Sequence, residues 1–409
     1  MRILPFAWML TLLAFTGVSA SPSTLDAETA AKIARTENPE MAAARSLVAE
    51  AEARTRTTGR LSNPELETTV AGGQDFEGRV SMGITQRFPL TGRLKFEREL
   101  SRLDVEMARL EVEERARQIE VAARSAFYEL VAARASIALA KQQSALSETF
   151  AKSIDEGVTQ GFGSKLDAQQ ARLAADTLRA AEGSLVSTEI DAASRLNGLL
   201  GRPANSPVTV KESLDLPKTI PASRPMGIRA DLKLAELAVE AGTEEVSLAK
   251  ATRWDDVGVG LFVEGERFRD EPEGIEPEAL VGIQFSVPLP FWQNGSGKVA
   301  EREAAKTRKA QQLEALRFKV RNDALSAYQI MAARHKSAAE ISAKLVPAAR
   351  EQVTASEAAY RRGELDIQAV FLARERLAAI EATALEAQKN YYLSYSQWIG
   401  ALGDRPSKP

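Results

Sequence analysis

The chain has 409 residues, of which 44% are hydrophobic and 27% are charged, a composition typical of folded rather than disordered proteins. The absence of cysteine excludes disulfides, thiolate metal sites and a cysteine nucleophile. With a formal net charge of −3, the sequence lacks the basic surplus of a general nucleic-acid-binding protein, so we expect no nucleic-acid partner.

The first segment, residues 1–20, has the pattern of a secretory signal peptide. Arg2 supplies a positive charge, residues 3–15 form an apolar core too short to span a bilayer, and small residues at 18–20 suit cleavage before Ser21. A buried first helix is the alternative interpretation. The rest of the sequence contains no apolar run of 18 residues, so we predict an exported chain without a transmembrane helix.

Two structural repeats are predicted, at 21–203 and 229–403, with a linker at 204–228 between them and a tail at 404–409. The segment FYELVAAR beginning at Phe127 recurs as AYQIMAAR beginning at Ala327, 200 residues later. GFGSKLD at 161–167 similarly matches RGELD at 362–366, and NGLLG at 197–201 matches IGALG at 399–403. Each repeat is expected to contain a helix, a β-hairpin, a long helix, a tip turn and another helix.

The first repeat is dominated by one predicted long helix. No proline lies between Pro89 and Pro203, and this interval is rich in the helix-forming residues Ala, Glu, Arg, Gln and Leu. A helix from about Gly92 to Asp155 would be roughly 95 Å long at 1.5 Å per residue. A tip turn is expected at 156–165. Helices of this length pack side by side in bundles, coiled coils or tubes.

Four strand-like segments, in hairpins at 64–90 and 256–290, alternate with a period of two. In the last segment, for example, Ile283 and Phe285 alternate with Gln284. A half-exposed soluble sheet shows the same alternation, but segments of about 9–11 residues also match tilted membrane strands. Trp254 and Trp292 flank the second hairpin at its base, where they would form either part of an aromatic girdle or a buried pair.

The segment PLPFWQNGSGK at 288–298 lies where a phosphate-binding loop would lie, between a strand and a long helix. That loop requires glycine where Trp292 stands and serine or threonine where Val299 stands, so a nucleotide site is not expected. Pro89, Pro288 and Pro290 are instead interpreted as joints between sheet and helix, because proline cannot donate to a strand's hydrogen-bond ladder.

The second long helix is predicted to begin at about Lys298. Pro347 should kink this helix or break its hydrogen-bond ladder near 344–347. A second tip turn is expected at 360–366. The only histidine, His335, lies mid-helix among Ala, Arg and Lys and is predicted to be a surface residue. Because no set of residues suits catalysis, metal binding or a cofactor, we expect no enzyme, no metal site and no cofactor.

In its repeat order, its strand–proline–helix joints and its helix-turn-helix tips, the chain resembles the TolC family of outer-membrane efflux ducts. The Asn38-Pro39-Glu40 segment is a further family feature. The resemblance implies a mainly α-helical homotrimer in which a transmembrane 12-strand β-barrel continues into a long α-helical barrel through the periplasm, with an equatorial layer outside it. Four strands cannot close a membrane barrel alone, which agrees with several copies.

The resemblance also implies function and partners. It implies a passive duct in outer-membrane lipid that works with a periplasmic adaptor and an inner-membrane RND pump. The 288–298 segment and Pro347 look most like the outer-membrane components of heavy-metal efflux systems of the cobalt–zinc–cadmium type, which implies metal cations as cargo and a role in heavy-metal resistance. A soluble periplasmic coiled-coil adaptor or scaffold is the alternative function.

The helix tips carry the candidate site residues that the resemblance implies. Asp167 and Tyr360 fall on family positions that close the periplasmic end, although Asp167 is also placed to stabilise a helix N-terminus. The chain departs from the best-known member at Leu365, where that protein has arginine, and at 369 and 372, where it has aspartates. The residues implied at the adaptor-docking tips are Gly161, Gly163, Gly363 and Asp366.

Overall fold

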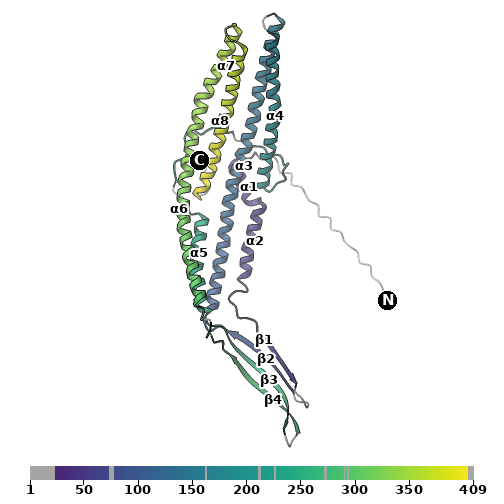
Figure 1. Cartoon of the computed structure of the whole chain (residues 1–409), viewed down its shortest axis with the longest axis vertical. Coiled ribbons are helices and arrows are strands. Elements are labelled where there is room, and N and C mark those ends of the chain that lie inside the picture. Colours follow the sequence, from purple (N-terminus) through teal and green to yellow (C-terminus); the bar gives the residue numbers. More distant parts are fainter. Residues whose placement is uncertain are drawn as a thin grey trace, which may run out of the picture.

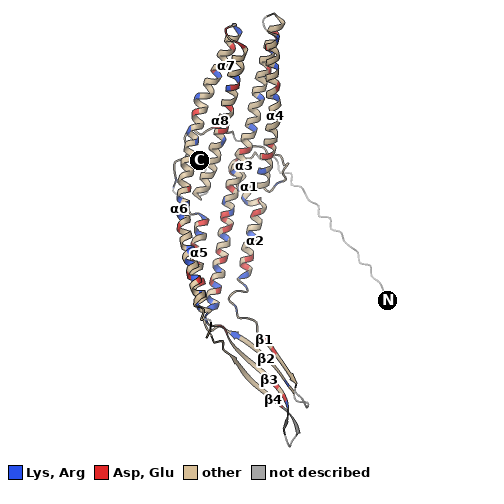
Figure 2. Ribbon diagram, viewed as in Figure 1, with Lys and Arg blue, Asp and Glu red and all other residues tan. Residues whose placement is uncertain are grey.

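The computed structural model describes residues 24–72, 78–161, 164–210, 213–224, 227–270, 274–289, 291–292 and 294–403. The predicted signal peptide, the tail at 404–409, Gly163 and Pro290 lie outside the described residues. The molecule is elongated, with helical tips at one end and a β-sheet at the other (Figure 1). Charged residues of both signs lie along the length of the helices (Figure 2).

The helical elements occur in a similar order in the two halves of the chain. In each half a helix precedes a pair of strands, and a long helical run leads to a tip from which another helix returns. The bounds are α1 Ala27–Glu37, α2 Pro39–Arg54, α3 Arg93–Thr159, α4 Lys165–Leu199, α5 Ala230–Ala251, α6 Ser296–Glu340, a π-helical turn at Ile341–Leu345, α7 Val346–Arg361 and α8 Ile367–Leu402.

Helix α3 is the central element, and it contacts α1, α2, α4, α5 and α8. Its 67 residues give a length of about 100 Å at 1.5 Å per residue. The helix continues to Thr159, four residues beyond the predicted end at Asp155. Small buried side chains such as Ala116 and Ala123 let neighbouring helices approach it closely.

In the described part of the chain, no helix is both long and apolar enough to cross a membrane.

The turn between α1 and α2 is fixed to the end of α4. The Asn38 side chain accepts a hydrogen bond from the Glu40 amide (2.8 Å) and donates one to the Leu199 carbonyl (2.9 Å). Gly201 has a φ of +69°, and a Cβ there would lie 2.4 Å from the Glu37 carbonyl oxygen. Glycine is therefore required at this position for both backbone conformation and space.

The four predicted strands are present and form one antiparallel sheet in the order β1-β2-β3-β4. The two hairpins join through the pairing of β2 with β3, and β1 and β4 are the edges. Strands β3 and β4, with 14 and 13 residues, exceed the predicted length of about 9–11, and β1 with 8 falls short. The bounds are β1 Glu65–Gly72, β2 Gly78–Phe88, β3 Val257–Asp270 and β4 Gly274–Ser286.

The second long helical run is irregular where Pro347 predicts a kink or break. A π-helical turn at Ile341–Leu345 separates α6 from α7, and Pro347 lies in the first turn of α7. Because proline has no N–H, it cannot complete the regular hydrogen-bond ladder. The irregularity is therefore confirmed, but the chain continues through a widened turn and the helix does not end.

Candidate functional site

One face of the sheet is a layer of exposed apolar side chains. The strand register places Leu66, Ile84, Leu261 and Ile283 in a single row across all four strands. Each of these side chains is between 58% and 65% exposed. Neighbouring rows on this face add the exposed side chains Val70, Val80, Met82, Val263, Val281 and Phe285. A contiguous apolar surface of this kind indicates contact with a membrane or another protein.

The opposite face of the sheet carries charged and hydroxyl side chains. Arg79 in β2 forms ion pairs with Glu264 (3.2 Å) and Glu266 (3.1 Å) of β3. Arg87 pairs with Glu65 of β1 at 3.1 Å. These pairs lie across strands, where opposite charges stabilise pairing. This face is therefore suited to contact with water.

Glycines on the polar face leave room for larger neighbours. Gly83, Gly258, Gly260 and Gly282 all belong to this face by the strand register. Thr85 lies over Gly260, where a Cβ would be only 2.6 Å from the Thr85 Oγ1, and Thr85 is only 7% exposed. Glycines in strands allow close approach and bending. Because bulky residues lie on one face and glycines on the other, the sheet is favoured to curve toward its polar face.

The first joint between sheet and helix is tied to the neighbouring chain segments. After Pro89 the chain turns, and Thr91 Oγ1 donates a hydrogen bond to the Ala251 carbonyl at the end of α5 (2.9 Å). Arg93, the first residue of α3, pairs with Asp256 just before β3 at 2.7 Å. These two contacts couple the β2–α3 joint to the α5–β3 joint.

The second joint is rich in exposed apolar residues. Pro288 lies in a segment without regular secondary structure after β4, and α6 begins after Gly295, whose φ is +69°. Trp292 is 96% exposed and Trp254 is 49% exposed, so these residues do not form the buried pair that the sequence left open. Phe291 is also exposed. Exposed aromatic side chains at one level suit the interface between lipid and water.

The helix tips bring Asp167 and Tyr360 together. Asp167 lies in the first turn of α4, and Tyr360 lies in the last turn of α7. The Tyr360 hydroxyl donates a hydrogen bond to Asp167 Oδ2 at 3.3 Å. Burial raises the pKa of Tyr360 above its ordinary value, and the negative charge of Asp167 adds to this effect. The contact joins the two helical hairpins of one chain.

The remaining tip residues lie around this contact. Gly161 and Gly363 adopt the left-handed conformation, with φ values of +84° and +75°, directly beyond the ends of α3 and α7. Asp366 precedes α8 but makes no side-chain cap hydrogen bond. Leu365 is exposed. The two glycines therefore allow the turns, as a residue with a Cβ would be strained there.

Sequence reasoning missed an arginine that holds the tip together. Arg374 of α8 pairs with Glu357 of α7 at 2.5 Å, and its guanidinium lies 4.3 Å from the centre of the Phe150 ring of α3. The first hairpin has the same acid–arginine spacing, with Arg172 paired to Asp155. Both pairs span 17 residues, and this shared spacing is the signal that could have found them.

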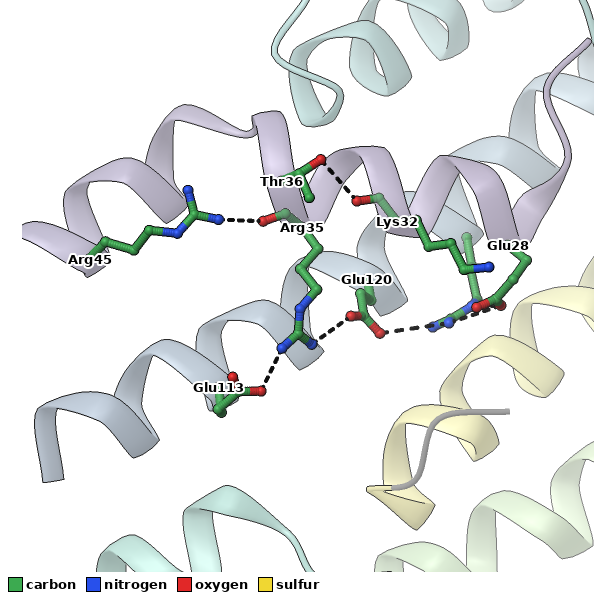
Figure 3. Close-up of polar contacts among 8 residues, drawn as sticks. Glu28, Lys32, Arg35, Thr36, Arg45, Glu113 and Glu120 are labelled. Atoms are coloured by element: carbon green, nitrogen blue, oxygen red, sulfur yellow. Dashed lines mark hydrogen bonds and ion pairs between the residues drawn. The ribbon is translucent and has the colours of Figure 1, made fainter. Parts of the chain in front are cut away.

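An ion-pair network fastens α1 to α3 (Figure 3), and α1 lies near the middle of the molecule (Figure 1). Arg35 of α1 contacts Glu113 (2.6 Å) and Glu120 (2.9 Å) of α3. Arg124 of α3 pairs with Glu28 of α1 at 3.1 Å and lies 3.7 Å from Glu120. The Arg124 side chain is nearly buried, so these carboxylates offset the cost of removing its guanidinium from water.

His335 is half-buried, although its sequence neighbours suggest a fully exposed surface residue. Its Nε2 lies 2.8 Å from the Pro217 carbonyl oxygen, and its ring contacts Tyr391 edge-on at a centroid distance of 5.2 Å. Pro217 belongs to the linker at 204–228 and is 118 residues away in sequence, so local pattern does not predict this contact. Within the described residues, no group of three His, Cys, Asp or Glu side chains is placed to hold a metal ion.

The comparison with known proteins agrees with this architecture. The chain has the fold of bacterial outer-membrane channels, and residues 227–404 match the family described as outer membrane efflux protein. The chain is similar to CusC, whose structures concern folding and transmembrane channel formation, with 16% identity, 92% of each chain covered and a TM-score of 0.76. No curated protein sequence matches the chain.

Two further solved structures extend the comparison. The outer membrane protein VceC from Vibrio cholerae is 15% identical, with 92% of this chain and 96% of VceC covered and a TM-score of 0.74. The open state of the MtrE outer membrane channel from Neisseria gonorrhoeae is also 15% identical, with 92% of this chain and 88% of MtrE covered and a TM-score of 0.73. At these identities the likeness concerns the fold.

Proposed function

We propose that the protein is a subunit of a passive outer-membrane channel in a tripartite efflux system. The observation that carries this proposal is the sheet at the end of the long helices, with a bulky apolar face and a polar, glycine-containing face. The apolar face contacts lipid, and the polar face lines a water-filled lumen. The helices extend the passage through the periplasm.

Three copies complete the channel. Strands β1 and β4 are the edges of the sheet in one chain, and open strand edges cannot exist in lipid. In a homotrimer, β4 of each copy pairs with β1 of the next, which gives a 12-strand barrel continuous with a barrel of long helices. The exposed Trp254 and Trp292 lie at the membrane interface, and the joints at Pro89 and Pro288 connect the two barrels.

The helix tips form the periplasmic entrance in this proposal. The contact between Tyr360 and Asp167 holds the two hairpins of each chain together and keeps the entrance closed. A periplasmic adaptor docks around the turns at Gly161, Gly363 and Asp366 and connects the channel to an inner-membrane RND pump. Heavy-metal cations are the proposed cargo, on the basis of the 288–298 segment and Pro347. A conduit needs no metal ligands for this role.

The alternative, a soluble periplasmic adaptor or scaffold, is not favoured. In a soluble monomer, the row containing Leu261 and Ile283 would be exposed to water together with its neighbours. Monomeric soluble proteins rarely expose contiguous apolar surfaces of this kind. A lipid environment provides a favourable contact for every one of these side chains.

Paired substitutions on adjacent residues test the proposal. Ile283→Lys places a charge on the face assigned to lipid, at a cost of roughly 2–4 kcal/mol near the bilayer midplane, whereas Gln284→Lys places it in the lumen. We expect the wild type and Gln284→Lys to fractionate with the outer membrane as trimers, and Ile283→Lys to give a lower trimer yield. Equal yields for the two variants, or a wild-type monomer that is soluble without detergent, would contradict the proposal.

A further inference from the structure

Phe262 is a large aromatic residue on the polar face of the sheet. The strand register places it in one row with Gly83 of β2 and Gly282 of β4, so glycine lies on both sides of it. Phe262 is only partly exposed, although most of the large apolar side chains on the other face of the sheet, such as Leu261 and Ile283, are more than half exposed. Its surroundings therefore differ from those of the other bulky residues of the sheet.

The Phe262 ring occupies the space that a side chain at position 282 would need. A Cβ on Gly282 would lie 2.4 Å from Phe262 Cζ and 2.5 Å from Cε1, which are atoms at the far end of the ring. On the other side, a Cβ on Gly83 would lie 3.1 Å from Phe262 Cβ. The ring therefore extends along the sheet, over the backbone of β4, and does not stand away from the sheet.

We propose that Gly282 sets the size of the solutes that pass through the β-barrel, because it lets the Phe262 ring lie against the wall. This inference rests on the proposed function, in which the polar face lines the lumen. A residue with a Cβ at 282 would exclude the ring from its position. The ring would then leave β4 for another staggered rotamer, and a ring that stands away from the wall projects into the lumen.

The narrowing caused by a displaced Phe262 ring would be repeated around the channel. In a trimer, three Phe262 rings lie at the same level of the barrel, so one substitution narrows the passage from three sides. Leu280 is exposed on the same face, one step further toward the β3–β4 turn, and adds apolar surface at this level. Gly282 and Phe262 are therefore a size-determining pair, and their effects on permeation should depend on each other.

The chain contains no cysteine, so a single reporter thiol can measure the width of the passage. Gln284→Cys places the thiol on the polar face, one step closer to the helices than Gly282. Intact cells are treated with membrane-impermeant maleimides attached to polyethylene glycol of increasing length. We expect Gly282→Ala to shift the cut-off for labelling to shorter reagents. Adding Phe262→Ala to this variant should restore the cut-off to at least that of the parent.

Two controls separate this inference from a general loss of structure. Gly265→Ala lies in β3, where a Cβ would meet nothing within 4 Å, and should leave the cut-off unchanged. Trimer yield is measured for every variant. If Gly282→Ala does not assemble, Phe262→Trp replaces it, since the larger ring exceeds the same space and should also shift the cut-off to shorter reagents.

The outcomes distinguish this inference from the proposed function. The role of the pair is overturned if an assembled Gly282→Ala trimer has an unchanged labelling cut-off. It is also overturned if the double variant admits no longer reagents than Gly282→Ala does. Where Phe262→Trp is used instead, an unchanged cut-off overturns it in the same way. The proposed function is tested separately by Phe285→Cys on the apolar face, which should resist the impermeant reagents. If Phe285→Cys is labelled and Gln284→Cys is not, the assigned faces are wrong and the proposed function fails as well.

Discussion

Removing the Tyr360 hydroxyl is the most direct test of the helix tips as a closed entrance. Tyr360→Phe abolishes the hydrogen bond to Asp167 and keeps the ring beside Phe150, with 6.3 Å between ring centres. A hydrogen bond to a charged group contributes about 1.5–3 kcal/mol, but this bond is long at 3.3 Å and partly exposed. We therefore expect a loss of about 1 kcal/mol per copy, which is a roughly fivefold shift toward open tips.

The conductance of single channels in planar bilayers measures this shift. Tyr360→Phe should raise the conductance without changing the yield of trimer, and Asp167→Ala should add little to it, because both changes remove one bond. Tyr328→Phe is the matched control, since its ring packs against Trp398 (5.7 Å) far from the tips. Equal conductance of Tyr360→Phe and the wild type would refute the reasoning.

The same bond predicts a dependence on pH. The pKa of Tyr360 is raised above its ordinary value of 10.0, first by burial and then by the Asp167 charge. The protonated hydroxyl is thus favoured in the folded tip, and its contribution is complete below pH 10.0 and lost as the pH rises through the raised pKa. At higher pH the wild type should reach or exceed the conductance of Tyr360→Phe, because the ionised Tyr360 and the Asp167 carboxylate repel each other, whereas the variant should lack this transition.

Two further predictions concern stability and are measured by thermal unfolding of the purified protein. Gly201→Ala should lower the free energy of unfolding by at least about 1–2 kcal/mol, because of its positive φ and the nearby Glu37 carbonyl, whereas Gly183→Ala in α4 should raise it by about 1 kcal/mol. Shifts in the same direction would contradict this account. Arg124→Ala should cost about 1–3 kcal/mol, since it removes a nearly buried side chain and leaves Glu28 without its partner, whereas Glu120 keeps Arg35; the exposed Arg102→Ala should change little.

Local pattern predicts much of this fold. The alternation of residues such as Ile283 and Gln284 gives the two faces of the strands, and the lack of proline between Pro89 and Pro203 gives the long helices. The pairing of β2 with β3 joins segments more than 150 residues apart, so its register depends on tertiary packing. The contact between Thr91 and Ala251 at the joint cannot be predicted from local pattern either, because these residues are 160 positions apart in sequence.

The candidate tip residues were predictable only in part. The correspondence between the two halves places Asp167 and Tyr360 at corresponding tips, one in each half, and the structure brings them into contact. Arg374 was overlooked because charges on long helices normally indicate solvated faces. Its role depends on Phe150 and Glu357, which belong to two other helices. Apart from the 17-residue spacing that it shares with the Asp155–Arg172 pair, only this arrangement in space distinguishes Arg374 from its exposed neighbours.

The π-helical turn before Pro347 lets the second half of the chain hold more residues than the first over the same helical run. Phe127 and Ala327 are 200 residues apart, but the tip glycines Gly161 and Gly363 are 202 apart, so the second half holds two additional residues in this interval. The π-helical turn lies within the interval and accommodates extra residues by widening the helix. Deletion of a residue here should be absorbed by a return to regular helix, whereas the same deletion in the uninterrupted α3 would rotate every contact beyond it.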